Sequence, residues 1–252
     1  MLKTVLITGA SAGIGEATAE LFAENQWNLI LMARRKDRLE EMKEYLSGKY
    51  GVQVHVLVAD IQNPSEVENA IDSLPESFSH IDVLVNNAGL AIGRDKAHET
   101  AKYAIDAMID TNIKGVLHLL NAVVPIMEKQ NSGTIINLSS IAGHEAYPGG
   151  AVYCATKYAV DAITKSLRMD LMATPIRVGA VSPGLVDTEF SLVRFEGDEA
   201  LAKSVYVGYD PLLAKDIAEA IYFSATRPAH VQIADIIILP TAQASATMVY
   251  KK

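Results

Sequence analysis

A tyrosine and a lysine four residues apart, Tyr153 and Lys157, have the residue types and the spacing for acid–base chemistry. Residues i and i+4 of a helix share one face, so the phenol and the ammonium can reach the same pocket. A phenol has an ordinary pKa of about 10, and a nearby cation lowers that pKa by favouring the phenolate. Tyr153 could then donate a proton to a carbonyl oxygen or accept one from an alcohol. Ser140, which follows an apolar run, could hydrogen-bond the same oxygen.

A glycine-rich segment, residues 8–15 (Thr-Gly-Ala-Ser-Ala-Gly-Ile-Gly), lies between an apolar run and a helical pattern. Glycine lets the backbone approach a pyrophosphate closely, and the following helix N-terminus offers free N–H groups. The segment lacks the Gly-Lys-Ser/Thr of loops that bind nucleoside triphosphates. Tight turns also use glycine, but the strand before and the helix after favour a nucleotide site at Gly9, Ser11, Ala12, Gly13, Ile14 and Gly15.

Arg34 and Arg35 follow the second apolar run, where a carboxylate would bind a ribose 2′-hydroxyl and an arginine a 2′-phosphate. Cations at a helix N-terminus oppose its dipole, and a bound phosphate would resolve that conflict. We therefore expect NADP, although a solvated helix start explains the same residues. Asp60, after the third run, could accept from the adenine amino group or cap the following turn. Asn87, Ala88 and Gly89, after the fourth, could line the nucleotide site or form a simple turn.

Seven apolar, β-branched runs alternate with six helical patterns along the chain. Near-continuous Val/Ile/Leu runs are typical of strands buried on both faces, and the alternation predicts parallel βαβ units. The sequence thus predicts an α/β fold: one Rossmann-type domain over residues 1–252, a doubly wound parallel sheet with helices on both faces. The expected strands are 4–8, 28–33, 52–59, 81–86, 133–139, 176–182 and 232–239. The expected helices are 14–25, 38–50, 64–74, 99–129, 151–172 and 214–225.

Composition narrows the class of protein. Among 252 residues, 22 are basic and 30 acidic, and the net charge of −8 argues against non-specific binding to nucleic acid. A single cysteine, Cys154, fits a reducing compartment, and no secretory signal or membrane span is visible, so we expect a cytoplasmic protein. The six histidines have no metal-ligand spacing, so we expect no metal. His144, beside the candidate residues, has no partner visible in the sequence.

These motifs together resemble the short-chain dehydrogenases/reductases over essentially the whole chain. The resemblance rests on residues 8–15, 86–89, 110–115 and 183–188 together with Ser140, Tyr153 and Lys157. It implies a catalytic tetrad of Asn112, Ser140, Tyr153 and Lys157, in which Asn112 holds a water against Lys157 and Lys157 also binds the nicotinamide ribose. It further implies that the segment with Pro183, Gly184, Val186 and Thr188 contacts the nicotinamide carboxamide. Taken alone, Asn112 would be a polar residue that kinks the helical stretch 99–129.

A narrower resemblance concerns the substrate. Residues 136–143, 147–150, 152–157, 188–198 and 239–243 are similar to NADP-dependent 3-hydroxy acid dehydrogenases, which oxidise serine, allo-threonine and related acids. Relatives in that subgroup reduce malonic semialdehyde or sulfoacetaldehyde. We therefore expect hydride transfer between NADP(H) and a small 3-hydroxy acid, and keep a reductase of another small carbonyl compound as the alternative. An NADP(H)-binding sensor or scaffold would be expected to lack Tyr153 or Lys157. A methyltransferase would call for an acidic residue at Arg34.

The last expectations about the substrate site concern the segment 185–213. A stretch of this length with little periodic pattern often covers a site, and Arg194 is its only arginine. A guanidinium between apolar residues is costly to bury without an anion. Arg194 could thus bind the substrate's carboxylate or sulfonate next to Tyr147, or form a salt bridge to Glu189, Glu196 or Asp198.

A homo-oligomer, with a tetramer favoured, is expected from the helix after Tyr153. Val160, Ile163, Leu167 and Leu171 form one apolar stripe, which further residues widen. A helix on a sheet needs only a stripe of about 100°, so the excess predicts burial against a partner helix. A helix sunk in its own domain would show the same pattern. The added residues are Ala155, Ala159, Ala162 and Met169.

Overall fold

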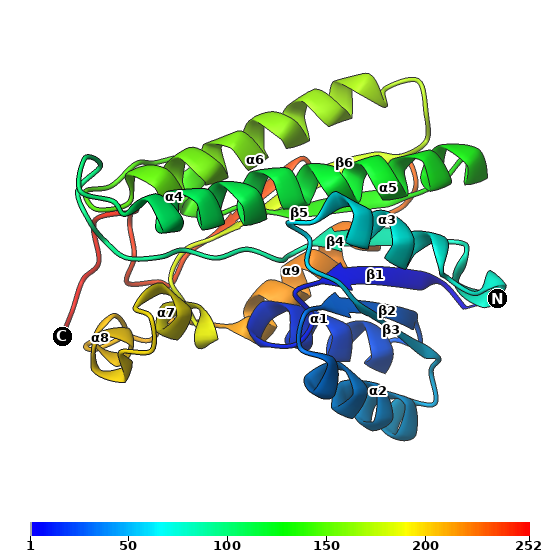
Figure 1. The fold of residues 1–252 in the computed structure, drawn as a ribbon, viewed down its shortest axis with the longest axis horizontal. Coiled ribbons are helices and arrows are strands. Elements are labelled where there is room, and N and C mark those ends of the chain that lie inside the picture. The colour runs from blue at the N-terminus through cyan, green and yellow to red at the C-terminus, as the bar shows by residue number, and fades with distance from the viewer. Residues whose placement is uncertain (1) are drawn as a thin grey trace.

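A seven-stranded parallel sheet forms the centre of the structure, a computed structural model that describes residues 2–252. Its strand order, β3-β2-β1-β4-β5-β6-β9, reverses between β1 and β4, and ligands of such sheets bind in the crevice at that point (Figure 1). The strands are β1 (Thr4–Thr8), β2 (Asn28–Ala33), β3 (Val54–Val58), β4 (Val83–Asn86), β5 (Thr134–Leu138), β6 (Arg177–Pro183) and β9 (Asp235–Ile238). The expected α/β fold is confirmed.

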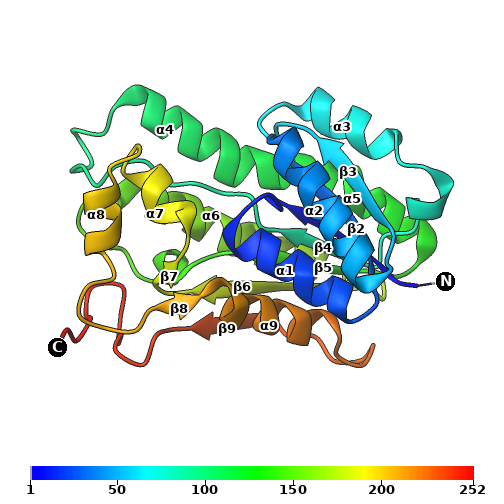
Figure 2. The same cartoon turned by 90° about the horizontal axis from the view of Figure 1, so that it is seen from below.

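Helices cover both faces of the sheet because successive strand residues point to opposite sides. In β1, Val5 and Ile7 pack into the core beneath α1, α2 and α9, whereas Leu6 packs into the core beneath α3, α5 and α6. Figure 2 views the molecule from the side of α1, α2 and α9. These helices are α1 (Gly13–Glu24), α2 (Lys36–Tyr50), α3 (Pro64–Asp72), α5 (Gly115–Gln130), α6 (Ala151–Asp170) and α9 (Ala214–Ala225). None of the helices in the described chain is long and apolar enough to cross a membrane.

The stretch 99–129 is not one regular helix. It consists of α4 (Lys102–Ile109), a π-helical turn η2 (Asp110–Lys114) and α5, which starts at Gly115. The π turn carries Asn112, whose side chain bonds to backbone outside the helix and so interrupts the regular ladder. The helical stretch is therefore interrupted at Asn112 by a π turn.

The segment 185–213 is more ordered than its sequence indicates. It contains β7 (Val186–Asp187), α7 (Glu189–Arg194), α8 (Glu199–Ser204) and β8 (Leu212–Leu213). Thr188 and Asp198 cap the two helices by accepting from the amides of Phe190 and Leu201. Helices of six residues are too short to give a readable period, which is why the sequence pattern does not reveal them. Figure 2 shows α7 toward the N-terminal end of α1 and α8 on the far side of α7.

Candidate active site

One cleft of about 370 Å³ opens at the carboxyl ends of the strands. It runs from Arg34 and Asp60 at one end to Ser140 and Lys157 at the other. Of the expected site residues, Gly15, Asn112, Tyr147 and Arg194 do not line it. The others do: Gly9, Ser11, Ala12, Gly13, Ile14, Arg34, Arg35, Asp60, Asn87, Ala88, Gly89, Ser140, Tyr153, Lys157, Pro183, Gly184, Val186 and Thr188.

The glycine loop has the form of an anion cradle. Gly9 and Gly13 have positive φ angles of 64° and 57°, which residues with a Cβ rarely adopt. Gly15 lies behind the loop, where a Cβ would stand 2.3 Å from the carbonyl oxygen of Gly9, so it permits close packing of α1 on β1. Ala12 precedes α1 and provides no side-chain cap, so the first amides of α1 keep their hydrogen-bonding capacity for a ligand.

Asn87 holds this cradle from the neighbouring strand. Its side-chain amide donates to the carbonyl oxygens of Thr8 and Gly9 at 2.8 and 3.3 Å. The Thr8 hydroxyl in turn accepts from the backbone amides of Asn87 and Ala88, both at 3.0 Å. The segment that follows β4 therefore shapes the nucleotide loop as well as lining the cleft.

The basic residues after β2 differ in how they are held. The Arg34 side chain is 63% exposed and has one long contact, 3.6 Å to Asp60. Arg35 donates to the hydroxyl and carbonyl oxygens of Ser11, each at 3.1 Å, and to Glu189 at 3.0 Å. Asp60 accepts from the amide of Gln62 at 3.0 Å, so its turn-capping role is confirmed while it also lines the cleft.

Sequence reasoning missed Arg38 and Glu189. Arg38 donates to Glu189 at 2.7 Å, and hydrogen bonds from Arg38 and then Arg35 lower the pKa of the Glu189 carboxyl below its ordinary value. Glu189 follows Thr188, which packs against Gly13 of the glycine loop. The ion pairs thus tie α7 to α2 beside the cleft. Arg38 belongs to the basic run 34–38, but no local pattern in the sequence pairs it with Glu189, which lies 151 positions away.

Lys157 lies at the buried end of the cleft. Its ammonium donates to the carbonyl oxygen of Leu138 at 2.8 Å, and the residue is 5% exposed. Burial lowers the pKa of Lys157 to about 8, and the charge of Asp161 opposes that shift. Lys157 Nζ lies 5.9 Å from the centre of the Tyr153 ring, so the two side chains share a pocket as expected.

The expectation that Lys157 lowers the pKa of Tyr153 is wrong for this arrangement. Burial raises the pKa of the Tyr153 phenol above its ordinary value, Tyr147 adds to the rise, and Ser140 and Arg194 oppose it. The cost of burying the phenolate outweighs the opposing effects of the Ser140 hydrogen bond and the Arg194 charge. Tyr153 is therefore a protonated donor at neutral pH, which suits carbonyl reduction.

Asn112 and Ser140 complete the expected tetrad. Asn112 Oδ1 accepts from the Leu90 amide at 2.9 Å, and its Nδ2 donates to the Leu90 carbonyl at 2.8 Å. A Cβ on Gly89 would stand 3.3 Å from Asn112 Oδ1 and 3.6 Å from Lys157 Nζ, so the missing side chain leaves the two groups facing one small gap. Ser140 caps a short 3₁₀ turn, η3 (Ile141–Gly143), and donates to the Pro183 carbonyl at 3.3 Å.

Arg194 lies beside Tyr153. Its guanidinium carbon is 5.8 Å from the centre of the Tyr153 ring, and it donates to the Tyr147 hydroxyl and the Gly93 carbonyl, each at 3.1 Å. The expected salt bridge is wrong: within residues 2–252 no carboxylate pairs with Arg194. Glu189 binds Arg35 and Arg38, Glu196 accepts from Tyr103, and Asp198 caps α8.

The apolar stripe on α6 faces its own domain. Val160 and Leu171 are 1% and 5% exposed, and Ile163 and Leu167 pack on the same core. That part of the oligomer argument is wrong, because this stripe packs on the core of its own domain. Ala155, Ala162 and Met169 of the widened stripe are exposed.

The chain belongs to the short chain dehydrogenase family, whose sequence pattern matches residues 3–198. It is 47% identical over 251 residues to a Schizosaccharomyces pombe protein named NADP-dependent 3-hydroxy acid dehydrogenase, covering 99% of this chain and 97% of that one. It is 45% identical over 245 residues to sulfoacetaldehyde reductase 2 of Chromohalobacter salexigens, covering 97% and 96%. The solved closed form of a serine dehydrogenase complexed with NADP+ has a TM-score of 0.93 at 40% identity, covering 99% of both chains.

Proposed function

We propose that this chain is an NADP-dependent oxidoreductase that interconverts the hydroxyl-bearing carbon of a small 3-hydroxy acid and the corresponding carbonyl. One observation carries the substrate class: Arg194, without a carboxylate partner in residues 2–252, lies beside the proton donor Tyr153. The names of the similar S. pombe protein and of the NADP-bound serine dehydrogenase support the same class.

The residues lining the cleft fit a dinucleotide along its length. The uncapped amides of α1 would bind the pyrophosphate, and Arg34, with Arg35, would bind the 2′-phosphate. Asp60 would face the adenine, and Lys157 the nicotinamide ribose. Ser139 Oγ, buried in the same wall, has no hydrogen-bond partner within the described chain. When bound, NADP(H) supplies or accepts a hydride at its nicotinamide ring.

The catalytic residues would act as a proton relay. In reduction, Tyr153 donates its proton to the carbonyl oxygen while the Ser140 hydroxyl hydrogen-bonds that oxygen and fixes its place. The Ser140 hydrogen bond and the charge of Arg194 favour the resulting phenolate. The gap beside Gly89 leaves room for a water between Asn112 and Lys157, through which Tyr153 would regain its proton. In oxidation the same residues move the proton in the opposite direction.

The anionic end of the substrate would be held by Arg194. Its contacts with Tyr147 and Gly93 leave further N–H groups of the guanidinium for a carboxylate or sulfonate. The segment 185–213 would cover the substrate, because α7 carries both Thr188 at its start and Arg194 at its end. Sulfoacetaldehyde is the second candidate substrate, since a similar protein is named for its reduction and its sulfonate would occupy the same site.

A substrate panel tests the proposal. The protein is assayed for NADPH oxidation with malonic semialdehyde, sulfoacetaldehyde and the neutral, size-matched propanal. NADP reduction is assayed with 3-hydroxypropanoate, serine and allo-threonine. We expect kcat/KM for an anionic aldehyde to exceed that for propanal by about 10²–10⁴-fold, because two hydrogen bonds to a charged group contribute about 1.5–3 kcal/mol each. NADPH binding without turnover of any compound would instead make the chain a sensor.

A homotetramer in the cytoplasm is the remaining part of the proposal. A hollow of about 300 Å³ between α4 and the first residues of α6 is almost wholly apolar, and at the other end of α6 Met169 and Met172 are 68% and 84% exposed. Contact with a second copy would bury this surface. Light scattering at micromolar concentration measures the assembly, and a monomer would refute it. The single, buried cysteine fits a reducing compartment.

A further inference from the structure

Thr156, the residue before Lys157, connects α6 to the π turn η2 that carries Asn112. Its hydroxyl accepts from Asn112 Nδ2 at 3.0 Å and donates to the Tyr153 carbonyl oxygen at 2.8 Å. Thr156 is 1% exposed, so both partners of its hydroxyl lie within the protein. A hydroxyl has one proton, and here that proton goes to Tyr153. Toward Asn112, Thr156 is therefore only an acceptor.

This acceptor determines which way the Asn112 carboxamide points, because only its Nδ2 end can face Thr156. Leu90 favours the same orientation, since its amide donates to Oδ1 at 2.9 Å and its carbonyl accepts from Nδ2 at 2.8 Å. Both Nδ2 protons are thereby used, and Oδ1 keeps a lone pair. Oδ1 borders the gap beside Gly89 that Lys157 Nζ also borders. The orientation thus places an acceptor, and not a donor, where the ammonium and a relay water would meet it.

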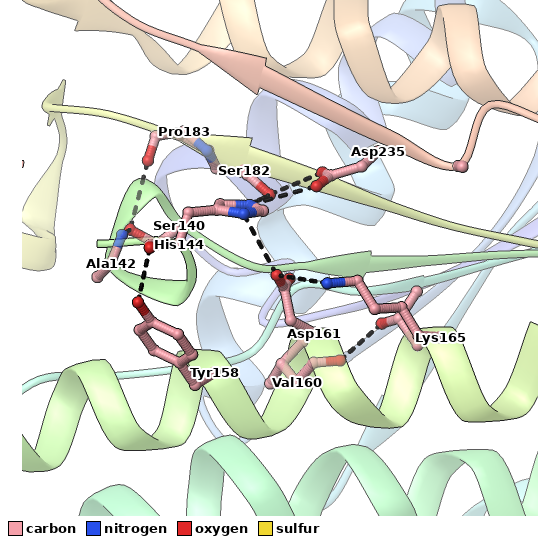
Figure 3. Close-up of polar contacts among 12 residues, drawn as sticks. Ser140, Ala142, His144, Tyr158, Val160, Asp161, Lys165, Ser182, Pro183 and Asp235 are labelled. Carbon is pink, nitrogen blue, oxygen red and sulfur yellow. Dashed lines mark hydrogen bonds and ion pairs between the residues drawn. The ribbon is translucent and has the colours of Figure 1, made fainter. Parts of the chain in front are cut away.

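Other contacts hold α6 in place independently of Thr156. The Tyr158 hydroxyl donates to the His144 carbonyl oxygen at 2.6 Å, and Asp161 Oδ2 lies 3.5 Å from Nδ1 of the His144 ring (Figure 3). Loss of the Thr156 hydroxyl alone would therefore leave the helix where it is. Its effect would be confined to Asn112 and the π turn.

We propose that Thr156 is a positioning residue of the active site, whose hydroxyl holds the Asn112 carboxamide with its oxygen toward Lys157. Thr156 does not line the cleft, so it acts through Asn112 and not by contact with cofactor or substrate. This inference deepens the proposed function and rests on it for its kinetic test.

Thr164 provides a matched control on the same helix. It is also 1% exposed, accepts from Asn137 Nδ2 at 2.9 Å and donates to the Val160 carbonyl oxygen at 2.7 Å. Asn137 is fully buried and does not line the cleft. A valine at either threonine removes one hydroxyl and leaves one asparagine donor without its partner, so the two variants should lose similar stability. Only Thr156→Val should disturb the proton relay.

The kinetic test compares Thr156→Val, Thr156→Ser and Thr164→Val in NADPH oxidation. The hollow that Thr156 lines is almost wholly apolar, so it can accept the added methyl of a valine. We expect kcat of Thr156→Val to fall about 10–100-fold through misplacement of Asn112. The KM for the aldehyde and the Kd for NADPH should stay within about twofold, because the binding contacts remain. Thr156→Ser keeps the hydroxyl and should recover about half of kcat or more.

The control separates positioning from stability. Thr164→Val should keep kcat within about twofold, although its Tm should fall as far as that of Thr156→Val. Equal losses of kcat in the two valine variants would show that both threonines only stabilise α6, and would overturn the proposal. Full activity of Thr156→Val would overturn it as well. If Thr156→Val does not fold, Thr156→Ala removes the same hydroxyl with a smaller side chain, and the same outcomes decide.

Hydrogen exchange followed by mass spectrometry tests the contact without turnover. The Leu90 amide donates to Asn112 Oδ1, so its protection reports whether the carboxamide keeps its place. We expect faster exchange in the peptide that contains Leu90 for Thr156→Val and no change for Thr164→Val. Unchanged exchange in Thr156→Val overturns the proposal even if no substrate is found. Faster exchange in a protein that turns over no compound points to failure of the proposed function alone.

Discussion

The two ends of the cleft use charge in opposite ways. At the end that Arg34 and Asp60 line, the Arg34 side chain is 63% exposed, and the charges of Arg35, Arg38 and Glu189 form pairs open to water. At the end that Ser140 and Lys157 line, Lys157 is 5% exposed, and burial shifts the pKa of both Lys157 and Tyr153. Exposed charges are screened by water and salt, so the first end can select a ligand but cannot shift a proton equilibrium far. The buried end can.

This difference predicts that substitutions at the buried end change turnover, whereas those at the exposed end change cofactor affinity. It also predicts that added salt weakens only the second group of effects. The following variants test this contrast, from the largest expected effect to the smallest.

Tyr153→Phe should cause the largest loss of turnover. The substitution removes the transferable proton and keeps the ring that packs 5.7 Å from Phe190. We expect kcat to fall by about 10²–10⁴-fold, the usual contribution of general acid–base catalysis. NADPH affinity, measured by fluorescence titration, should stay within about twofold. Retention of more than about a tenth of kcat would require another proton donor.

Arg194→Ala should separate charged substrates from neutral ones. We expect kcat/KM for malonic semialdehyde to fall about 100-fold, because charge-assisted hydrogen bonds to the carboxylate are lost. For propanal the loss should be about threefold or less. Tyr147→Phe is the companion variant, since it removes only the hydroxyl to which Arg194 donates at 3.1 Å. Equal losses for both aldehydes would show that Arg194 holds the loop and does not bind the substrate.

Arg34→Asp should move the preference from NADP toward NAD. The new carboxylate repels a 2′-phosphate and can accept from a 2′-hydroxyl. We expect the ratio of kcat/KM for NADP to that for NAD to fall by more than about tenfold, a moderate effect because the side chain is largely exposed. Raising the ionic strength should reduce the NADP preference of the unaltered protein. A preference that is the same in Arg34→Asp would remove Arg34 from the phosphate site.

The strands and most of the candidate site could be predicted from the sequence because both depend on local patterns. Near-continuous apolar runs mark strands buried on both faces, and glycine or polar residues just beyond them mark the cleft. Ser140 is visible in this way, whereas Tyr153 and Lys157 are visible from their helical spacing, and all three line the cleft.

What the sequence could not provide depends on contacts between distant positions. His144 meets Asp161 and Asp235 through three separate elements. The predicted direction of the Tyr153 pKa shift was wrong for the same reason. The direction depends on how deeply the phenol is buried, and the spacing between Tyr153 and Lys157 does not reveal that burial. Glu189 meets Arg35 and Arg38 only because α7 folds back over the glycine loop.

Glu189→Gln should give the smallest effect, on how fast the cofactor leaves. Glu189 ties α7 to α2 through Arg35 and Arg38. The adjacent Thr188 packs on Gly13 of the glycine loop. We therefore expect this contact to open before a bound dinucleotide is released. The pair is exposed, and exposed pairs contribute little, so we expect NADPH dissociation in stopped flow to accelerate about two- to fivefold. At about 1 M salt, where screening is complete within a few ångströms, the difference should disappear. Glu196→Gln is the matched control, a carboxylate of the same segment that accepts from Tyr103 at 2.8 Å. Slower dissociation in Glu189→Gln would mean that Glu189 competes with the 2′-phosphate for Arg35, and the charges at the exposed end would then oppose cofactor binding.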